Sequence, residues 1–261
     1  MQKIIIVTGA SSGIGFATAC LLEQNGYKIV NISKEDCEKF ETYTLDITNY
    51  TELEKIIDQV GEKYGEIFAL INCAGFGISG ATELTKEDMA QKIMDVNFMG
   101  TFYASKYCLK YMKKGAKIIN ISSACALYPV PFRTFYCASK AAVQMLSYGL
   151  KMELKNAGID VCAVCPGEVQ TNFSKNRQKD FSTNEKYGNS VKQAALHIEH
   201  NEKKRMSPLV VANRILKLIN TKKMKPYVIV SGKYKVLSFF TRFVPQSLIL
   251  KGSNKILGGK K

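Results

Sequence analysis

The first 24 residues carry the feature that most constrains the fold. A β-branched apolar run, Ile4 to Val7, leads into the glycine-rich segment Thr8-Gly-Ala-Ser-Ser-Gly-Ile-Gly15, and a helical pattern follows from Phe16 to Gln24. Such an apolar run is typical of a strand that is buried on both faces of a sheet. The order predicts a strand, a tight turn at a helix N-terminus, and then the helix.

This turn suits a pyrophosphate. Glycines let the backbone turn tightly and approach the phosphates, whose negative charge is favoured by free N–H groups at the start of a helix. The spacing is G-x-x-x-G-x-G rather than the G-x-G-x-x-G fingerprint of dinucleotide-binding proteins, so the turn alone leaves its ligand ambiguous. The glycines are Gly9, Gly13 and Gly15, and Thr8, Ser11 and Ser12 add hydroxyl donors.

A second group of reactive residues lies downstream. Tyr136 and Lys140 stand four residues apart in a predicted helix, Tyr136 to Leu154, and therefore project from the same face. A lysine ammonium beside a phenol lowers the phenol pKa from about 10 towards neutrality, as a general acid for carbonyl reduction needs. Ser123 can donate a hydrogen bond to the same carbonyl oxygen. A Tyr-x-x-x-Lys pair is also common as a structural feature of amphipathic helices, so the pair alone leaves both interpretations open.

The order of the motifs resembles that of the short-chain dehydrogenase/reductase family, from Lys3 to about Thr171. The resemblance implies an NAD(P)-binding Rossmann-fold oxidoreductase that needs no metal. The matching segments are Thr8 to Gly15, Leu45-Asp46-Ile47, Asn72-Cys-Ala-Gly75, Asn97, Ile121-Ser-Ser123, Tyr136 with Lys140, and Pro166-Gly-Glu-Val-Gln-Thr171.

The same resemblance implies roles for individual residues. It makes Tyr136 the proton donor, Lys140 its pKa-lowering neighbour and a ribose ligand, Ser123 the group that orients the carbonyl, and Asn97 the anchor of a proton-relay water. Cys73 is a departure, because the family often has a second Asn there, but a thiol occupies similar space. The implied cofactor contacts are Gly9, Ser11, Ser12, Gly13, Ile14 and Gly15 in the loop, Asp46 and Ile47 at the adenine, Asn72, Ala74 and Gly75 at a strand end beneath the cofactor, and Pro166, Gly167, Val169 and Thr171, of which Thr171 touches the nicotinamide carboxamide.

The choice of cofactor depends on the end of the second strand. An acidic residue there binds the ribose 2′-OH of NAD, whereas a cation accepts the 2′-phosphate of NADP. The segment Lys28-Ile-Val-Asn-Ile-Ser-Lys34 contains no acidic residue, and Ser33 with Lys34 offers a hydroxyl and a positive charge. The sequence therefore favours NADP over NAD. Glu35 and Asp36 would repel a phosphate if the strand ended later.

The spacing of apolar segments predicts the fold class. Strands and helical stretches alternate along the 261 residues, which indicates an α/β fold with a single doubly wound parallel sheet flanked by helices on both faces. We expect residues 1–233 to form one dehydrogenase domain that includes a substrate lid at about 172–208. Residues 234–261 then form a basic, apolar C-terminal extension. The predicted strands are Lys3 to Val7, Lys28 to Ile32, Ile67 to Asn72, Lys117 to Ile121, Asp160 to Val164 and Tyr227 to Val230.

Two patterns suggest metal binding but have simpler interpretations. Cys162 and Cys165 have C-x-x-C spacing, yet in a strand residues three apart point to opposite faces, and no second such pair is present. His197 and His200 lie three apart in a predicted helix, but the lysines and glutamates around them are typical of a solvated face. We expect no metal. The eight cysteines are scattered, as in a reduced, cytoplasmic protein, and Cys125 and Cys137 flank the proposed catalytic residues.

Positive charge is concentrated at the C-terminus. Residues 1–202 hold 22 Lys or Arg and 22 Asp or Glu, whereas residues 203–261 hold 15 basic residues and no acidic one. The apolar stretch Tyr234 to Leu250 contains Arg242 and Pro245 and is shorter than the roughly 20 residues that cross a bilayer. Its aromatic and basic residues resemble an interfacial segment that contacts anionic lipid from the cytosolic side.

Other interpretations of the C-terminal extension remain open. Phe239, Phe240, Phe243 and Leu248 can instead pack over the substrate pocket or a partner subunit. A nucleic acid is a weaker candidate, because no recognition motif accompanies the basic residues. The first apolar run feeds the glycine turn directly, so we expect no secretion signal.

The expected reaction is reduction of an apolar ketone, or its reverse. Ala124, Leu127, Tyr128, Val130, Pro131 and Phe132 lie between Ser123 and Tyr136 and predict a mostly apolar pocket wall. The substrate class is then lipid-like, steroid-like or acyl-like. The alternatives are a catalytically silent NADP-sensing or scaffold protein and a membrane-docking module. The resemblance also implies a homodimer or homotetramer, formed through the helix that begins near Tyr136.

Overall fold

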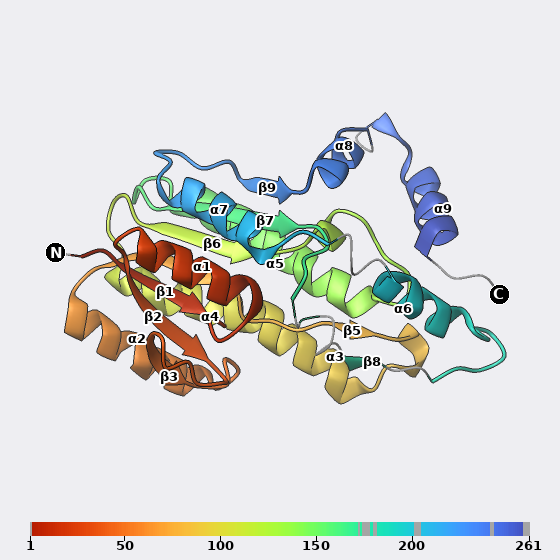
Figure 1. Ribbon diagram of the computed structural model, residues 1–261, viewed down its shortest axis with the longest axis horizontal. Helices are drawn as coiled ribbons and strands as arrows, with labels where there is room; N and C mark the ends of the chain where they lie inside the picture. The colour runs from red at the N-terminus through yellow and green to blue at the C-terminus, as the bar shows by residue number, and fades with distance from the viewer. Residues whose placement is uncertain are drawn as a thin grey trace.

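The computed structural model describes residues 2–171, 173, 178–179, 182–200, 205–240 and 243–257. Its centre is a parallel sheet of seven strands in the order β3-β2-β1-β4-β6-β7-β9 (Figure 1). The chain crosses from one half of the sheet to the other between β3 and β4, which places a crevice at the carboxyl ends of the central strands. The strands are β1 (Ile4–Thr8), β2 (Lys28–Ser33), β3 (Glu41–Thr44), β4 (Ile67–Asn72), β6 (Lys117–Ile121), β7 (Asp160–Pro166) and β9 (Tyr227–Val230).

Helices cover both faces of the sheet. On one face α1 (Gly13–Gln24) and α7 (Pro208–Ile219) pack against odd-numbered residues of β1 such as Ile5. On the other face α2 (Tyr50–Tyr64), α4 (Gly100–Cys108) and α5 (Thr134–Glu153) pack against even-numbered residues such as Ile6. Alternate residues of a strand point to opposite faces, so one uninterrupted apolar run supplies both cores. The predicted doubly wound α/β fold is therefore confirmed.

All six predicted strands are present, five of them at the predicted start. The sequence analysis missed β3, whose residues Glu-Thr-Tyr-Thr are polar and only half-buried because the strand lies at the sheet edge. β3 pairs in parallel with β2, from Val30 opposite Glu41 to Ser33 opposite Thr44. A pattern search for apolar runs does not find a strand of this kind.

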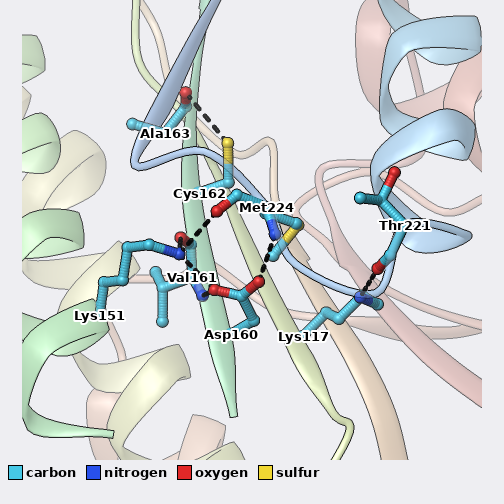
Figure 2. A network of polar contacts seen from close by, with 8 residues as sticks. All are labelled: Lys117, Lys151, Asp160, Val161, Cys162, Ala163, Thr221 and Met224. Atoms are coloured by element: carbon cyan, nitrogen blue, oxygen red, sulfur yellow. Dashed lines mark hydrogen bonds and ion pairs between the residues drawn. The ribbon is translucent and has the colours of Figure 1, made fainter. Parts of the chain in front are cut away.

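A polar network fixes the end of the sheet that lies away from the crevice (Figure 2). The carboxylate of Asp160, the first residue of β7, accepts hydrogen bonds from the Lys151 ammonium, from its neighbour's backbone N–H at Val161 and from the Met224 N–H. Lys117 of β6 donates to the Thr221 carbonyl. The network joins α5, β7 and the chain between α7 and β9, so these elements hold the sheet's second half in register.

Most of the remaining elements gather beyond the carboxyl ends of β6, β7 and β9 (Figure 1). No helix within the described residues is long and apolar enough to cross a membrane. The elements beyond the carboxyl ends are the two-stranded sheet β5 (Ile78–Ser79) with β8 (Gln178–Lys179), the helices α3 (Glu87–Met94), α6 (Ser190–His200), α8 (Gly232–Phe240) and α9 (Gln246–Leu257), the π-helical turn η2 (Asp95–Met99), and the 3₁₀ turns η1 (Thr82–Leu84) and η4 (Ala124–Ala126). A further 3₁₀ turn, η3 (Leu109–Tyr111), connects α4 to β6.

Candidate functional site

A cavity of about 630 Å³ opens at the carboxyl ends of the central strands, as expected for this topology. It brings the glycine loop and Tyr136 to one site, although they lie more than 120 positions apart in the chain. The predicted residues that line it are Gly9, Ser11, Ser12, Gly13, Ile14, Gly15, Ser33, Lys34, Asp46, Ile47, Ala74, Gly75, Ser123, Tyr136, Lys140, Pro166, Gly167, Val169 and Thr171. Asn72 and Asn97 do not line it.

The glycine loop is packed so tightly that no side chain fits at the positions of Gly9 and Gly15. Gly9 has a φ of +72°, and a Cβ there would lie 2.9 Å from the Cα of Ala74. A Cβ on Gly15 would lie 2.1 Å from the Gly9 carbonyl oxygen. Helix α1 begins at Gly13, so its free N–H groups face the cavity that a pyrophosphate would enter. The loop therefore fits the dinucleotide that the sequence predicted.

Two buried polar residues hold this loop in place. The side-chain oxygen of Asn31, in the middle of β2, accepts a hydrogen bond of 2.9 Å from the Ala10 N–H. The Thr8 hydroxyl accepts bonds of 3.1 Å from the N–H groups of Cys73 and Ala74 and so ties β1 to the chain after β4. Thr8 does not line the cavity. The sequence analysis missed Asn31. Its signal was a polar residue inside an otherwise apolar strand.

Tyr136 and Lys140 lie one turn apart on α5, and both are buried. The Lys140 ammonium donates a hydrogen bond of 2.9 Å to the carbonyl oxygen of Ile121, the last residue of β6. Burial lowers the pKa of this ammonium to about 8, an effect that the Cys73 and Cys165 thiols oppose. A cation is therefore held close to the phenol at the expense of its own solvation.

Ser123 is the second residue after β6 and caps the short turn η4. Its hydroxyl oxygen accepts a hydrogen bond of 3.2 Å from the Cys125 N–H. A hydroxyl that accepts in this way can still donate its own hydrogen. Ser123 thus has the chemistry to donate to a carbonyl oxygen in the cavity.

Asn97 lies beneath the cavity floor, within the π-helical turn η2, a kind of turn that is frequent at functional sites. Its side-chain oxygen accepts from the Phe76 N–H at 2.9 Å, and its nitrogen donates to the Phe76 carbonyl and to the Ser139 hydroxyl, each at 3.0 Å. A Cβ on Gly75 would lie 2.8 Å from that oxygen, which explains a glycine at this position.

Asn72 is also placed away from the cavity. It ends β4, and its side-chain nitrogen donates to Asn120 at 2.8 Å and to Ser105 at 3.3 Å. Asn72 was predicted to belong to the strand end that passes beneath the cofactor, and it is the last residue of β4. The side chain joins β4 to β6 and α4, and the backbone that follows it forms the cavity floor through Ala74 and Gly75.

The adenosine end of the cavity contains Ser33, Lys34 and Asp46. The Ser33 hydroxyl accepts from Asn31 at 2.8 Å and donates to the Glu35 carbonyl at 2.7 Å, so it is already engaged in the structure. Lys34 is exposed and lies 3.4 Å from the Asp46 carboxylate. β2 ends at Ser33, so Lys34 comes directly after the strand, where the sequence analysis placed it.

The opposite end of the cavity is more polar than the sequence suggested. Of the six residues expected to form an apolar wall, Ala124 and Val130 line the cavity, whereas Leu127, Tyr128, Pro131 and Phe132 do not. The turn between η4 and α5 directs these four side chains elsewhere. The lining residues that the sequence analysis missed at this end include Arg133, Phe173, Arg205 and Tyr234. Arg133 stands three positions before Tyr136, and this closeness in sequence could have indicated that it lines the cavity. No sequence pattern indicated Tyr234.

None of the eight cysteines forms a disulfide bond. Cys162 and Cys165 lie in β7 as predicted, and burial raises the pKa of both thiols to about 12. No cluster of three or more metal-ligating side chains occurs among the described residues. The side chains of His197 and His200 lie outside the described part of the chain. Within the predicted lid, 172–208, residues 172, 174–177, 180–181 and 201–204 also lie outside it.

Comparisons with known proteins agree with this geometry. Residues 3–182 match the family described as short chain dehydrogenase. The chain is 36% identical to a 3-ketodihydrosphingosine reductase of Bacteroides thetaiotaomicron over 227 residues, which are 84% of each protein. The crystal structure of a short-chain dehydrogenase from Streptomyces avermitilis superposes with a TM-score of 0.84 over 96% of both chains, at 24% identity.

A further solved structure, ElxO with NADP bound, superposes with a TM-score of 0.75 at 25% identity and covers 90% of this chain and 100% of its own. The family match covers more than half of the chain, in the segment that forms the glycine loop, the Tyr-x-x-x-Lys pair and the sheet. The chain is therefore an oxidoreductase of the short-chain dehydrogenase/reductase family.

Proposed function

We propose that this protein is an NADP-dependent oxidoreductase that interconverts a ketone and a secondary alcohol on an apolar substrate. One observation carries the proposal. Tyr136, Lys140 and Ser123 line the same cavity as the glycine loop, so a proton donor and a dinucleotide site meet. The nicotinamide cofactor, when bound, supplies or accepts the hydride.

In the proposed mechanism the protein moves the proton. The Tyr136 hydroxyl gives its proton to the carbonyl oxygen during reduction and takes it back during oxidation. The Ser123 hydroxyl donates a hydrogen bond to the same oxygen and fixes its position. Lys140, held by the Ile121 carbonyl, favours the phenolate form of Tyr136 by its charge. Asn97 anchors the relay by which Tyr136 regains a proton.

The NADP preference is proposed from Lys34. This exposed ammonium comes directly after β2 and lines the cavity. Its ion pair with Asp46 is exposed to solvent and therefore weak, so a 2′-phosphate can compete with Asp46 for Lys34. The NADP-bound ElxO structure supports the preference. Lys34→Ala should raise the KM for NADPH about tenfold and leave the KM for NADH nearly unchanged. An equal rise for both cofactors would contradict this assignment.

The substrate is proposed to be a lipid-like, steroid-like or acyl-like ketone. The similarity to a 3-ketodihydrosphingosine reductase supports ketone reduction on a long-chain molecule. The decisive experiment measures oxidation of NADPH and NADH by wild type and Tyr136→Phe across ketones from small and polar to long-chain. NADPH-dependent turnover of bulky ketones that is lost in Tyr136→Phe supports the proposal. No turnover despite tight NADPH binding would favour the alternative, a catalytically silent NADP sensor or scaffold.

A second candidate function is attachment to an anionic membrane surface through the C-terminal extension, residues 234–261. Eight of the fourteen exposed large apolar side chains among the described residues lie between positions 236 and 250. Phe239, Phe240 and Phe243 form an aromatic cluster with ring centroids 5.6 and 5.7 Å apart, and Phe243 is 76% exposed. Aromatic side chains next to lysines suit the lipid interface. Such contact would be peripheral and cytoplasmic.

Sedimentation with phosphatidylserine-containing liposomes tests this attachment. Replacing Phe239, Phe240 and Phe243 together by Ser should lower binding at least tenfold, because burying each ring stabilises the bound state by about 1.5–3 kcal/mol. Leu209→Ser, at another exposed apolar position on α7, is the matched control. Substitution is preferable to truncation, since Tyr234 of the extension lines the cavity. Equal binding by both variants would remove this candidate function.

Assembly as a homodimer or homotetramer through α5 is also proposed. Met145 and Met152 of α5 are 67% and 73% exposed, an unusual position for large apolar side chains unless another subunit covers them. Light scattering of wild type and of a Met145→Lys, Met152→Lys double variant tests this arrangement. A wild-type mass equal to one chain would contradict it.

A further inference from the structure

Arg133 places a positive charge beside the proposed proton donor. It directly precedes α5, and its guanidinium carbon lies 4.5 Å from the ring centroid of Tyr136. Its Nη1 lies 3.9 Å from the Cys125 sulfur. Both neighbours line the cavity, as Arg133 itself does. The guanidinium therefore lies at the face of the reacting phenol, towards the substrate end of the cavity.

Within the described part of the chain, this charge has no counter-ion. The ion pairs among the described residues include none to Arg133, and its Nε is buried without a hydrogen-bond partner. Glu168 lines the same cavity but forms no ion pair with it. Arg133 is half-buried. A guanidinium stays ionised at every physiological pH, and removing part of it from water without an anion costs solvation energy. Among the described residues, the Arg133 guanidinium therefore lacks a negatively charged group to pair with.

The backbone next to Arg133 is strained. Phe132 has a φ of 60°, the one positive value among the non-glycine residues that the structure describes, and it is unfavourable for a bulky side chain. The Phe132 carbonyl accepts a hydrogen bond of 2.9 Å from the Gly80 N–H, and its ring contacts that of Tyr187 edge-on. Strain of this kind persists where surrounding contacts hold it, often at ligand sites. Here it sets the position from which Arg133 enters the cavity.

We propose that Arg133 binds a carboxylate of the substrate, so that the preferred substrate is an oxo acid with an apolar chain. The inference rests on the proposed ketone reduction at Tyr136 and names its substrate class. A carboxylate accepts two parallel hydrogen bonds from a guanidinium and supplies the missing charge. Because Arg133 lies against the Tyr136 ring, that carboxylate is a few bonds from the ketone. The apolar chain extends along Val130 and Phe173, which also line the cavity. An ammonium group in the same place is repelled.

Three matched probes test the assignment with NADPH: a ten-carbon 4-oxo fatty acid, its methyl ester, and the ten-carbon ketone without the carboxyl group. Wild type should show a kcat/KM for the acid roughly 10- to 100-fold above that for the ketone. Arg133→Gln should abolish this preference, so that the values for the acid and the ketone come to within about threefold of each other. Lys155→Gln removes the same charge from the exposed surface and should keep the preference.

Other outcomes overturn the proposal. Equal losses for all three probes in Arg133→Gln, with a shifted pH profile, would mean that Arg133 acts through Tyr136. No preference in wild type would exclude a carboxylate site. Calorimetry of decanoate binding in the presence of NADPH distinguishes a missing carboxylate site from a missing ketone reduction. Decanoate binding that Arg133→Gln weakens at least tenfold keeps the anion site even without turnover, and absence of both binding and turnover refutes it.

Discussion

The buried ammonium of Lys140 makes a prediction about stability that does not depend on activity. Burial lowers its pKa from 10.5 to about 8, so the folded protein releases this proton earlier than the unfolded chain as the pH rises. Between pH 8 and 10.5 the unfolded state binds more protons, and the free energy of unfolding therefore rises with pH. At about 1.36 kcal/mol for each pH unit, the full gain is about 3 kcal/mol. Below pH 8 the folded state carries this cost in full.

Lys140→Met removes the titrating group and keeps the length of the side chain. We expect the difference in unfolding free energy, wild type minus variant, to increase by about 2–3 kcal/mol between pH 7.5 and pH 10. Urea denaturation followed by circular dichroism at steps of half a pH unit measures both proteins. Loss of the hydrogen bond to the Ile121 carbonyl shifts the variant's curve by a constant amount and leaves the slope difference intact. Parallel curves over this range would refute the reasoning.

Three further predictions concern the loop and the sheet. Gly15→Ala should weaken NADPH binding at least 100-fold in a fluorescence titration, because its Cβ would lie 2.1 Å from the Gly9 carbonyl oxygen. The control Gly252→Ala on α9, where no atom lies within 4 Å of the added Cβ, should leave the affinity for NADPH unchanged. Asn31→Ala should lower the free energy of unfolding by about 1–3 kcal/mol, since the buried Ala10 N–H loses its acceptor, and an unchanged urea midpoint would contradict this. Asp160→Ala should cost about 3 kcal/mol or more in the same assay, since it leaves the Lys151 ammonium without its carboxylate; a loss below about 1 kcal/mol would mean that solvent replaces the contact.

Much of the fold was predictable because its signals are local. Each central strand is an apolar run, and each alternates with a helical pattern, which together specify a parallel sheet with covered faces. The strand that the prediction missed, β3, lies at the edge and is half exposed, so its residues alternate in no apolar pattern. Its existence depends on pairing with β2, a contact that a local window does not contain.

The candidate site, like the fold, combines features that short segments predict with features that only packing decides. The glycine loop and the Tyr136–Lys140 pair were visible because a turn and an i,i+4 spacing are properties of short segments. The orientation of the Asn72 side chain was not visible in the sequence, since it depends on Asn120 of the neighbouring strand, to which it donates a hydrogen bond. The apolar wall was overestimated for a similar reason. Which face of an irregular loop lines a cavity is decided by packing, and here packing brought in Arg133.

The sequence by itself determined the order of strands and helices, the phosphate-binding turn and the chemistry of the Tyr136 region, because these depend on residue type and spacing along the chain. Only the tertiary structure decided that Asn31 supports the loop and that Tyr234 from the C-terminal extension lines the cavity. These contacts join segments that are far apart in sequence or meet only at the sheet. Their energies come from burial and hydrogen bonding between such segments, which no local pattern contains.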